Sequence, residues 1–287
     1  MQILYYGLLI LSILLETSKN VFTNSFSKNS LKNETDIYKF NFFTYAGSII
    51  VLMFFKGGGS SYFTVILAAF FAIAIWLNQY FALKALKIGS MSFTNFILGS
   101  GLIIPIIYGA IVNGDVISKP QYLLLAVLIA SMALSLNIGK NGIGLKWLIL
   151  SLISMFFAGT IGIFQTVHQS SNHSGELISF LRYAFIFTII INFIGWQITE
   201  RKEKSSFSIK SSAIIQAGFS GAFIGSVHII NLFLSGVMLK VIFFPIVNGG
   251  LIFATLISDL IFFKEKLNLK QWIGIIIGTF ALCVIGL

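Results

Sequence analysis

The chain has 287 residues, of which 57% are hydrophobic, 15% are aromatic and only 10% are charged. Soluble domains contain about 25% charged residues, so this composition excludes a water-soluble globule. The abundance of phenylalanine excludes a disordered chain, and the single cysteine, Cys283, excludes an internal disulfide and a CxxC metal site. The net charge of +10 falls in gaps between apolar runs, where lipid headgroups rather than nucleic acid are the expected counter-charge.

Apolar runs bounded by polar residues predict an all-α integral membrane protein with ten transmembrane helices. Each run approaches the roughly 20 residues that cross a bilayer, which is longer than the strands of an outer-membrane barrel. The second run is barely long enough to span, and the ninth is long enough to tilt or break. The longest gaps, 25–38 and 199–210, are expected to be loops. In chain order the helices are predicted at 2–24, 39–55, 61–83, 90–112, 120–138, 144–167, 176–198, 211–235, 238–263 and 269–287.

Lysine and arginine are divided unequally between alternate gaps. One side has little more than Lys56, Lys119 and Lys240. The positive-inside rule therefore places the other side in the cytoplasm and both termini outside the cell, in an inner or plasma membrane. The cytoplasmic side contains Lys28, Lys32, Lys39, Lys84, Lys87, Lys140, Lys146, Arg201, Lys202, Lys204, Lys210, Lys264, Lys266 and Lys270.

The second half of the chain repeats the first weakly. At an offset of 150, residues 80–136 align with 230–286, and an offset near 142 lays 16–22 on 158–164. We therefore expect two five-helix units, 1–140 and 141–287; the odd helix number makes them inverted repeats. The aligned pairs are Phe93 with Phe243, Gly99 with Gly249, Asp115 with Glu265, Gln121 with Gln271 and Tyr122 with Trp272.

The last two helices carry a recognisable motif. It runs Pro245-Ile-Val-Asn-Gly-Gly-Leu-Ile-Phe-Ala, then an acidic turn with Glu265, then Gln271-Trp-Ile-Gly274 and a glycine-rich helix. This pattern resembles the second half of an EamA-type carrier of the drug/metabolite transporter superfamily. The first half matches more loosely, with Asn95 where the family often has proline. The resemblance implies ten helices in two inverted repeats and a transport function, but not a substrate.

Glu16 and Lys19 are ionisable residues expected at bilayer depth. They lie three residues apart, so they share one helical face and can neutralise each other. An ionisable group at this depth costs at least about 2.5–3.5 kcal/mol on insertion scales, so it is retained where it is paired, hydrated or used. Two interpretations stay open. Glu16 holds a proton or a cationic substrate group, as the resemblance to small multidrug transporters implies, or the two residues form a structural ion pair.

Further polar residues are candidates for a midplane site at the interface of the repeats. The offset of 150 pairs Asn78 with His228, and Gln79 and Asn231 lie close by in sequence. The alternative role for these side chains is a hydrogen bond between helices.

Asn95 and Asn248 lie in the fourth and ninth helices, which contain Pro105 and Pro245. Proline removes a backbone donor, so both helices are expected to kink and to form a site wall or gate, unless the kinks serve packing alone. Small residues in the two helices, namely Gly99, Ser100, Gly101, Gly249 and Gly250, should let these helices approach closely.

The remaining polar residues have mainly structural interpretations. Arg182 is expected either to extend to the membrane–water interface or to face a substrate carboxylate. Asp259 is expected to pair with Lys264 at the interface, and Asp115 and Glu265 to act in helix-joining turns. His168 and His173 are expected in a polar loop rather than a metal site. Four aromatic residues are candidates either for an aromatic wall around an organic cation or for lipid-facing positions, namely Tyr45, Trp76, Tyr80 and Tyr183.

Enzymatic motifs such as HExxH, GxSxG and the P-loop are missing from the sequence, and no cofactor is expected. We therefore expect a secondary carrier of a small polar or amphipathic metabolite, such as an amino acid or organic cation. Its partners would be that substrate, the lipid bilayer and either protons or a counter-substrate, in a monomer or homodimer. The alternative is an integral-membrane lipid-headgroup enzyme or a lipid flippase. A channel would need a continuous polar pore, whereas the polar residues here cluster at mid-depth.

Overall fold

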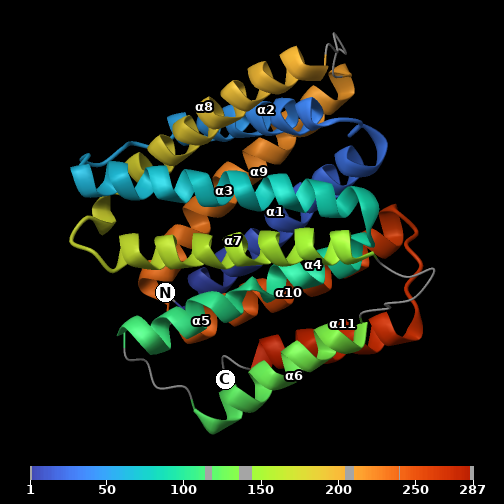
Figure 1. The fold of residues 1–287 in the computed structure, drawn as a ribbon. Helices are drawn as coiled ribbons and strands as arrows, with labels where there is room; N and C mark the ends of the chain where they lie inside the picture. The colour runs from blue at the N-terminus through green and yellow to red at the C-terminus, as the bar shows by residue number, and fades with distance from the viewer. Residues whose placement is uncertain (1, 114–117, 136–143, 204–209, 239, 285–287) are drawn as a thin grey trace.

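The computed structural model describes residues 2–113, 118–135, 144–203, 210–238 and 240–284, and these residues form helices joined by short turns (Figure 1). The all-α prediction is confirmed over these ranges. The elements are α1 (Gln2–Asn29), α2 (Glu34–Met53), α3 (Tyr62–Ile88), α4 (Met91–Gly99), η1 (Ser100–Leu102), α5 (Ile103–Tyr108), η2 (Gly109–Asn113), α6 (Lys119–Ser135), α7 (Leu145–Gln169), η3 (Ser174–Glu176), α8 (Leu177–Glu203), α9 (Ser211–Val237), α10 (Lys240–Phe262) and α11 (Leu269–Val284).

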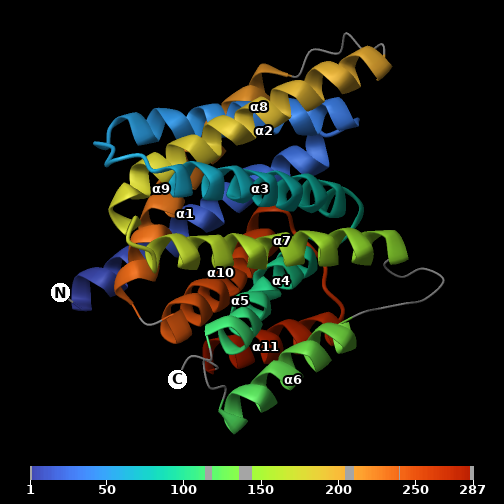
Figure 2. The ribbon, with the colours of Figure 1, turned by 60° about the vertical axis from the view of Figure 1, so that its left-hand side comes forward.

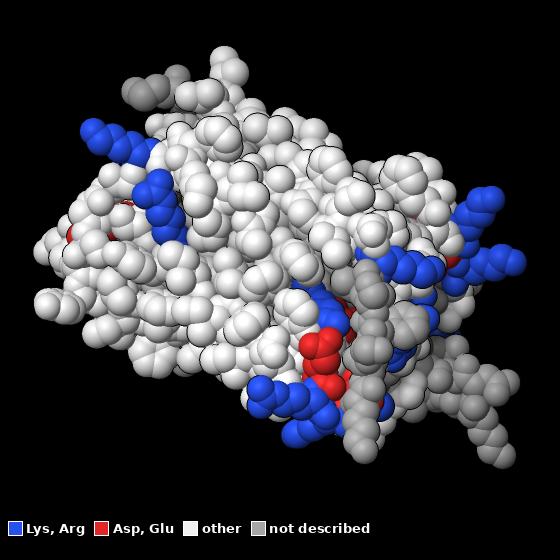
Figure 3. All heavy atoms as spheres, turned by 90° about the horizontal axis from the view of Figure 1, so that it is seen from above, with Lys and Arg blue, Asp and Glu red and all other residues white. Residues whose placement is uncertain are grey.

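Length and composition indicate a membrane protein. Six helical segments of the described chain are long and apolar enough to cross a membrane, at 62–88, 91–108, 145–169, 174–203, 211–237 and 242–262. Apolar side chains also cover the outside of the molecule; Tyr62 is 91% exposed and Phe280 is 67% exposed. Figure 3 shows an uncharged belt across the middle of one face, with basic side chains gathered toward its ends.

The helices pack as an inner group between two outer pairs (Figures 1 and 2). Helix α2 packs on α8 at one edge, and α6 packs on α11 at the other. Between these pairs, α1 contacts α9 and α10, α3 contacts α7, and α4 contacts both α7 and α10. Segments from the two halves of the chain therefore alternate through the interior, and each inner helix has a partner from the other half.

Two predicted loops are shorter than expected. Helix α1 continues to Asn29, and α2 already begins at Glu34, where Asn33 and Asp36 form a capping box. Helix α8 continues to Glu203. The expectation that 25–38 and 199–210 are loops was therefore wrong in part, because a helix ends where its backbone groups find caps rather than where its hydropathy falls.

The predicted helical break lies in the fourth apolar run, not in the ninth. Residues 91–113 form α4, a 3₁₀ turn, α5 and a π-helical turn, whereas α10 is continuous through Pro245. Gly101 lies against α7 at the break: a Cβ there would lie 2.7 Å from the carbonyl oxygen of Met155. The broken segment and α7 therefore meet almost backbone to backbone.

The glycines expected to join the fourth and ninth helices mostly face other partners. Gly99 does meet Ile252 of α10, but Gly249 faces Cys283 of α11 and Gly250 faces Ile13 of α1. The prediction was wrong for the glycines of α10 because adjacent positions on a helix point to different neighbours. Among the glycines that the structure describes, the tightest contact is between α9 and α2, where a Cβ on Gly221 would lie 1.9 Å from the carbonyl oxygen of Thr44.

This contact predicts a strong difference between two glycines of α9. Gly221→Ala should lower the free energy of unfolding by about 1–3 kcal/mol, because the added methyl group would push α2 away. Gly218→Ala is the matched control, since a Cβ at Gly218 has no atom within 4 Å. Thermal unfolding in detergent measures both; equal melting temperatures for the two variants would contradict the packing.

Candidate binding cavity

A cavity of about 200 Å³ lies among the inner helices. A single water needs roughly 10–15 Å³ by the same measure, so the space admits a small metabolite or several waters. Its walls come from α1, α3, α7, α9, α10 and the broken α4–α5 segment, with one residue from α2. Its polar lining comprises Glu16, Lys19, Asn20, Tyr45, Asn78, Gln79, Asn95, Gln165, His228, Asn231, Asn248 and Thr255. The structure thus brings together the six residues predicted as a substrate site, namely Glu16, Asn78, Asn95, His228, Asn231 and Asn248.

The Glu16–Lys19 pair forms as expected from its spacing. The Lys19 ammonium donates a hydrogen bond of 2.8 Å to Glu16 Oε1. The Glu16 side chain is 22% exposed and the Lys19 side chain is 13% exposed, because both face the cavity. A carboxylate and an ammonium group therefore lie side by side in the cavity wall, and each offers a charge to a ligand.

The other predicted residues are held by neighbouring helices. The Asn78 amide donates to the carbonyl oxygen (2.9 Å) and hydroxyl (3.1 Å) of Ser154 on α7. His228 Nδ1 lies 3.2 Å from Gln165 Nε2, also on α7. These contacts fix the side chains across helix boundaries while leaving them on the cavity wall.

Asn231 and Asn248 are anchored differently. Asn231 accepts a 2.5 Å hydrogen bond from the Ser12 hydroxyl of α1, whereas the Asn248 amide donates to the Phe244 carbonyl oxygen of its own helix. Next to this site, Gln79 is only 4% exposed and its Nε2 has no hydrogen-bond partner. A buried donor without an acceptor is costly, so Gln79 favours a ligand that carries an acceptor group.

Arg182 lies away from the cavity. Its guanidinium donates to the carbonyl oxygens of Leu52 (3.0 Å) and Phe55 (2.6 Å), at the end of α2. Of the two interpretations of Arg182, contact with a substrate carboxylate is wrong, and these contacts agree with the structural alternative. The last carbonyls of a helix lack partners and carry partial negative charge, which attracts a cation.

The four aromatic residues considered as one wall are dispersed. Tyr45 lines the cavity, but Tyr183 contacts Ser60 at the end of the bundle and Tyr80 contacts Lys84. The Trp76 indole nitrogen is buried without a hydrogen-bond partner. An aromatic cage for an organic cation is therefore not assembled by these residues, because Trp76 and Tyr80 contact each other rather than the cavity, and Tyr45 alone of the four lines it.

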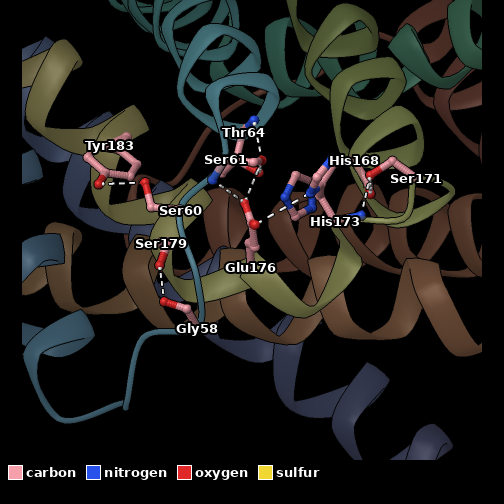
Figure 4. A network of polar contacts seen from close by, with 10 residues as sticks. All are labelled: Gly58, Ser60, Ser61, Thr64, His168, Ser171, His173, Glu176, Ser179 and Tyr183. Atoms are coloured by element: carbon pink, nitrogen blue, oxygen red, sulfur yellow. Dashed lines mark hydrogen bonds and ion pairs between the residues drawn. The ribbon is translucent and has the colours of Figure 1, made fainter.

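A polar network joins the turn before α3 to the turn before α8 (Figure 4). Glu176 accepts hydrogen bonds from the backbone N–H (2.9 Å) and hydroxyl (2.8 Å) of Ser61, and His173 Nδ1 lies 3.4 Å from its carboxylate. His168 was expected in the same polar loop, but it lies in α7, fully buried and stacked on Phe180. This network ties the two halves together at the end of the bundle opposite most lysines.

Asp259 is the main residue that the sequence interpretation missed. It is fully buried rather than paired with Lys264, and it accepts hydrogen bonds from Asn24 (2.7 Å) and Asn95 (3.2 Å). Its position one turn before a helix end suggested the interface; only the packing of α1 and α4 against α10 buries it. Glu265, which was expected to act in a helix-joining turn, accepts hydrogen bonds from the backbone N–H groups at the start of α4. The predicted residues Asp115, Lys140 and Lys204 lie outside the described residues.

Comparisons with known proteins identify the fold alone. No family model matches the chain, and no curated protein matches it. A solved structure described as "Crystal structure of protein" superposes with a TM-score of 0.61 at 9% sequence identity. The match covers 95% of this chain and 97% of that chain, so the same arrangement of helices extends over nearly the full length of both.

The ion pair predicts a diagnostic pattern of stability. Glu16→Gln should lower the free energy of unfolding by about 3–5 kcal/mol, because it leaves the Lys19 ammonium buried without its counter-charge. Adding Lys19→Met should restore most of that loss. Melting temperatures in detergent test this double-mutant cycle, and strictly additive losses would show that the two charges do not depend on each other.

A second prediction separates Arg182 from the cavity. Arg182→Gln should lower the free energy of unfolding by about 1.5–3 kcal/mol through loss of charged hydrogen bonds to α2. Arg201→Gln, on an exposed last turn of α8, is the control and should change stability little. Ligand titrations of both variants should match wild type; weakened binding in Arg182→Gln alone would contradict this assignment.

Proposed function

We propose that the protein is a secondary carrier that moves a small zwitterionic metabolite, such as an amino acid, across an inner or plasma membrane by alternating access. The observation that carries this proposal is the central cavity, whose wall contains the adjacent Glu16 carboxylate and Lys19 ammonium. Charged groups inside a bundle of apolar helices are retained where they are paired, hydrated or used. Here they are paired and also face an open space.

Inverted five-helix repeats, at 1–140 and 141–287, would supply the two alternating states. Several features support them. Helices α3 and α9 are both 27 residues long. Helices α6 and α11 each have a glutamine as their third residue, Gln121 or Gln271, whose side-chain oxygen accepts the backbone N–H of the residue before the helix. The packing of α1 on α9 has its counterpart in the packing of α7 on α3, as exchange of the halves requires.

Ten spans are proposed although six helices qualify by hydropathy. The α6 and α11 helices are apolar but short, at 17 and 16 residues. Helix α2, at 20 residues, is long enough to cross the hydrocarbon core, and together with α1 it completes the ten spans. Helix α1 has 28 residues, and most polar residues in its middle lie at the cavity or in the buried cluster around Asn24. Thr17 and Ser18 instead donate to carbonyl oxygens of their own helix. Such a helix satisfies its polar groups inside the bundle. The lysine-rich ends would face the cytoplasm.

The substrate class follows from the charges of the wall. The ammonium group of an amino acid would pair with Glu16, and its carboxylate would pair with Lys19 and accept a hydrogen bond from Gln79. A simple organic cation is less favoured, because Lys19 would repel it. A lipid-headgroup enzyme or a flippase remains the alternative function, and it would bind phosphorylated headgroups instead.

A thermal-shift panel on the purified protein tests the proposal. L-amino acids should raise the melting temperature, since a ligand at 100 times its Kd stabilises by about 2.7 kcal/mol. Tetraethylammonium, nucleosides and phosphoethanolamine should not. The double variant Glu16→Gln/Lys19→Met should lose the response, and Arg201→Gln should retain it. Stabilisation by phosphoethanolamine alone would favour the lipid-headgroup alternative.

A further inference from the structure

Asp259 is a buried carboxyl group with only neutral hydrogen-bond donors identified around it. Its Oδ1 accepts from Asn24 Nδ2 at 2.7 Å, and its Oδ2 accepts from Asn95 Nδ2 at 3.2 Å. Ser92 lies three residues before Asn95 on α4, so the two side chains share one face of that helix. Asp259 and Asn24 are both completely buried, and Ser92 is 3% exposed. Asn95 belongs to the cavity wall as well, so this cluster adjoins the cavity directly.

The charged groups on the surrounding elements do not neutralise Asp259. On α1, Lys19 is paired with Glu16, and the Lys28 ammonium donates to the Gly89 carbonyl oxygen. Helix α4 has no ionisable side chain, α11 has Lys270 and Cys283, and His228 of α9 bonds to Gln165. Beyond α10, Lys264 and Lys266 make no ion pair with Asp259 within the described part of the chain, and Glu265 adds a like charge.

A second observation concerns Asn24. Its Oδ1 atom is buried and has no hydrogen-bond donor, although its amide nitrogen is bonded to Asp259. Burial of a carboxylate without a counter-charge costs free energy, and burial of a carbonyl oxygen without a donor adds a second cost. One added proton on the carboxyl group would remove the buried charge and also provide a donor to the cluster.

We propose that Asp259 is protonated when the cluster is closed and is the proton-coupling group of the carrier, in place of Glu16. This inference rests on the proposed transport function. Glu16 has Lys19 as a permanent counter-charge, whereas Asp259 has none. Protonation forms an O–H bond at Asp259 with a proton taken from water, and release returns the proton to water. The charged form requires hydration, so an ionised Asp259 would keep this end of the bundle open.

The structure also assigns an exit for the proton. The Ser92 hydroxyl donates to Glu265 Oε2 at 2.7 Å, and Glu265 is partly exposed in the turn after α10. A path from the cavity through Asn95 and Asp259 therefore reaches the lysine-rich end by way of Ser92. Glu265 also caps α4 through the backbone N–H groups of Met91 and Ser92, so the path crosses the contact that holds α4 closed.

Isotope-edited infrared spectroscopy tests the protonation directly. The chain contains three aspartates, Asp36, Asp115 and Asp259, so carbon-13 labelling of the aspartate carboxyl groups leaves few candidates. At neutral pH the wild-type protein should show an isotope-sensitive band of a protonated carboxyl group that is absent in Asp259→Asn. Asp36→Asn is the matched control, because Asp36 is also buried but accepts backbone N–H bonds from Lys32 and Asn33. A missing band, or a band unchanged in Asp259→Asn, overturns the inference.

Proteoliposomes test the coupling. With labelled L-amino acids as the probe, a pH gradient should drive accumulation in wild type, up to about tenfold per pH unit for one proton per substrate. Asp259→Asn should lose this accumulation but keep exchange of labelled for unlabelled amino acid, because its amide retains a donor and an acceptor for Asn24 and Asn95. Accumulation that persists in Asp259→Asn, or that depends on Na⁺ instead of pH, overturns the assignment. Absence of all transport in wild type would overturn the proposed function, while the infrared result decides the protonation by itself.

Discussion

A polar group buried among apolar helices has no water to replace a missing partner, and this constraint organises the molecule. The outer surfaces of the helices are apolar, so polar side chains have to meet one another in the interior. The Glu16–Lys19 pair, the Asn78–Ser154 contact and the Asn231–Ser12 contact all satisfy this requirement across the cavity region. The cavity is therefore the place where the fold concentrates its polar chemistry, and the Gln79 Nε2 atom lies in its wall without a hydrogen-bond partner.

Close backbone packing makes that interior possible. Helices α2 and α9 approach until Gly221 touches the backbone of Thr44, and the broken α4–α5 segment meets α7 at Gly101 and Gly159. Small residues permit such contact where lipid provides no hydrophobic force to drive helices together. The break in the fourth helix lies beside the cavity, where irregular backbone is tolerated because protein and not lipid surrounds it.

The two ends of the bundle are held by different kinds of contact. At the lysine-rich end, the salt bridge between Lys39 and Glu200 joins α2 to α8, and Glu265 caps α4. At the opposite end, Glu176 caps α3 through Ser61 (Figure 4). Each contact crosses between halves of the chain. Carboxylates at helix starts are stabilised by the backbone N–H groups there.

Sequence alone determined the helical class, the positions of the apolar runs and six of the polar residues that meet in the cavity, whereas Asn20, Gln165 and Thr255 were not identified from it. Hydrophobic run length and the cost of burying charge are local properties, so they can be evaluated without a structure. The tertiary structure decided the partners. Asp259 and Asn24 are far apart in the chain and become neighbours only when α1 packs on α10, whereas Arg182 is diverted to the end of α2. Asp259 appeared interfacial from sequence because distance from a helix end does not reveal which helix covers it; burial depends on contacts between segments that the chain order does not specify.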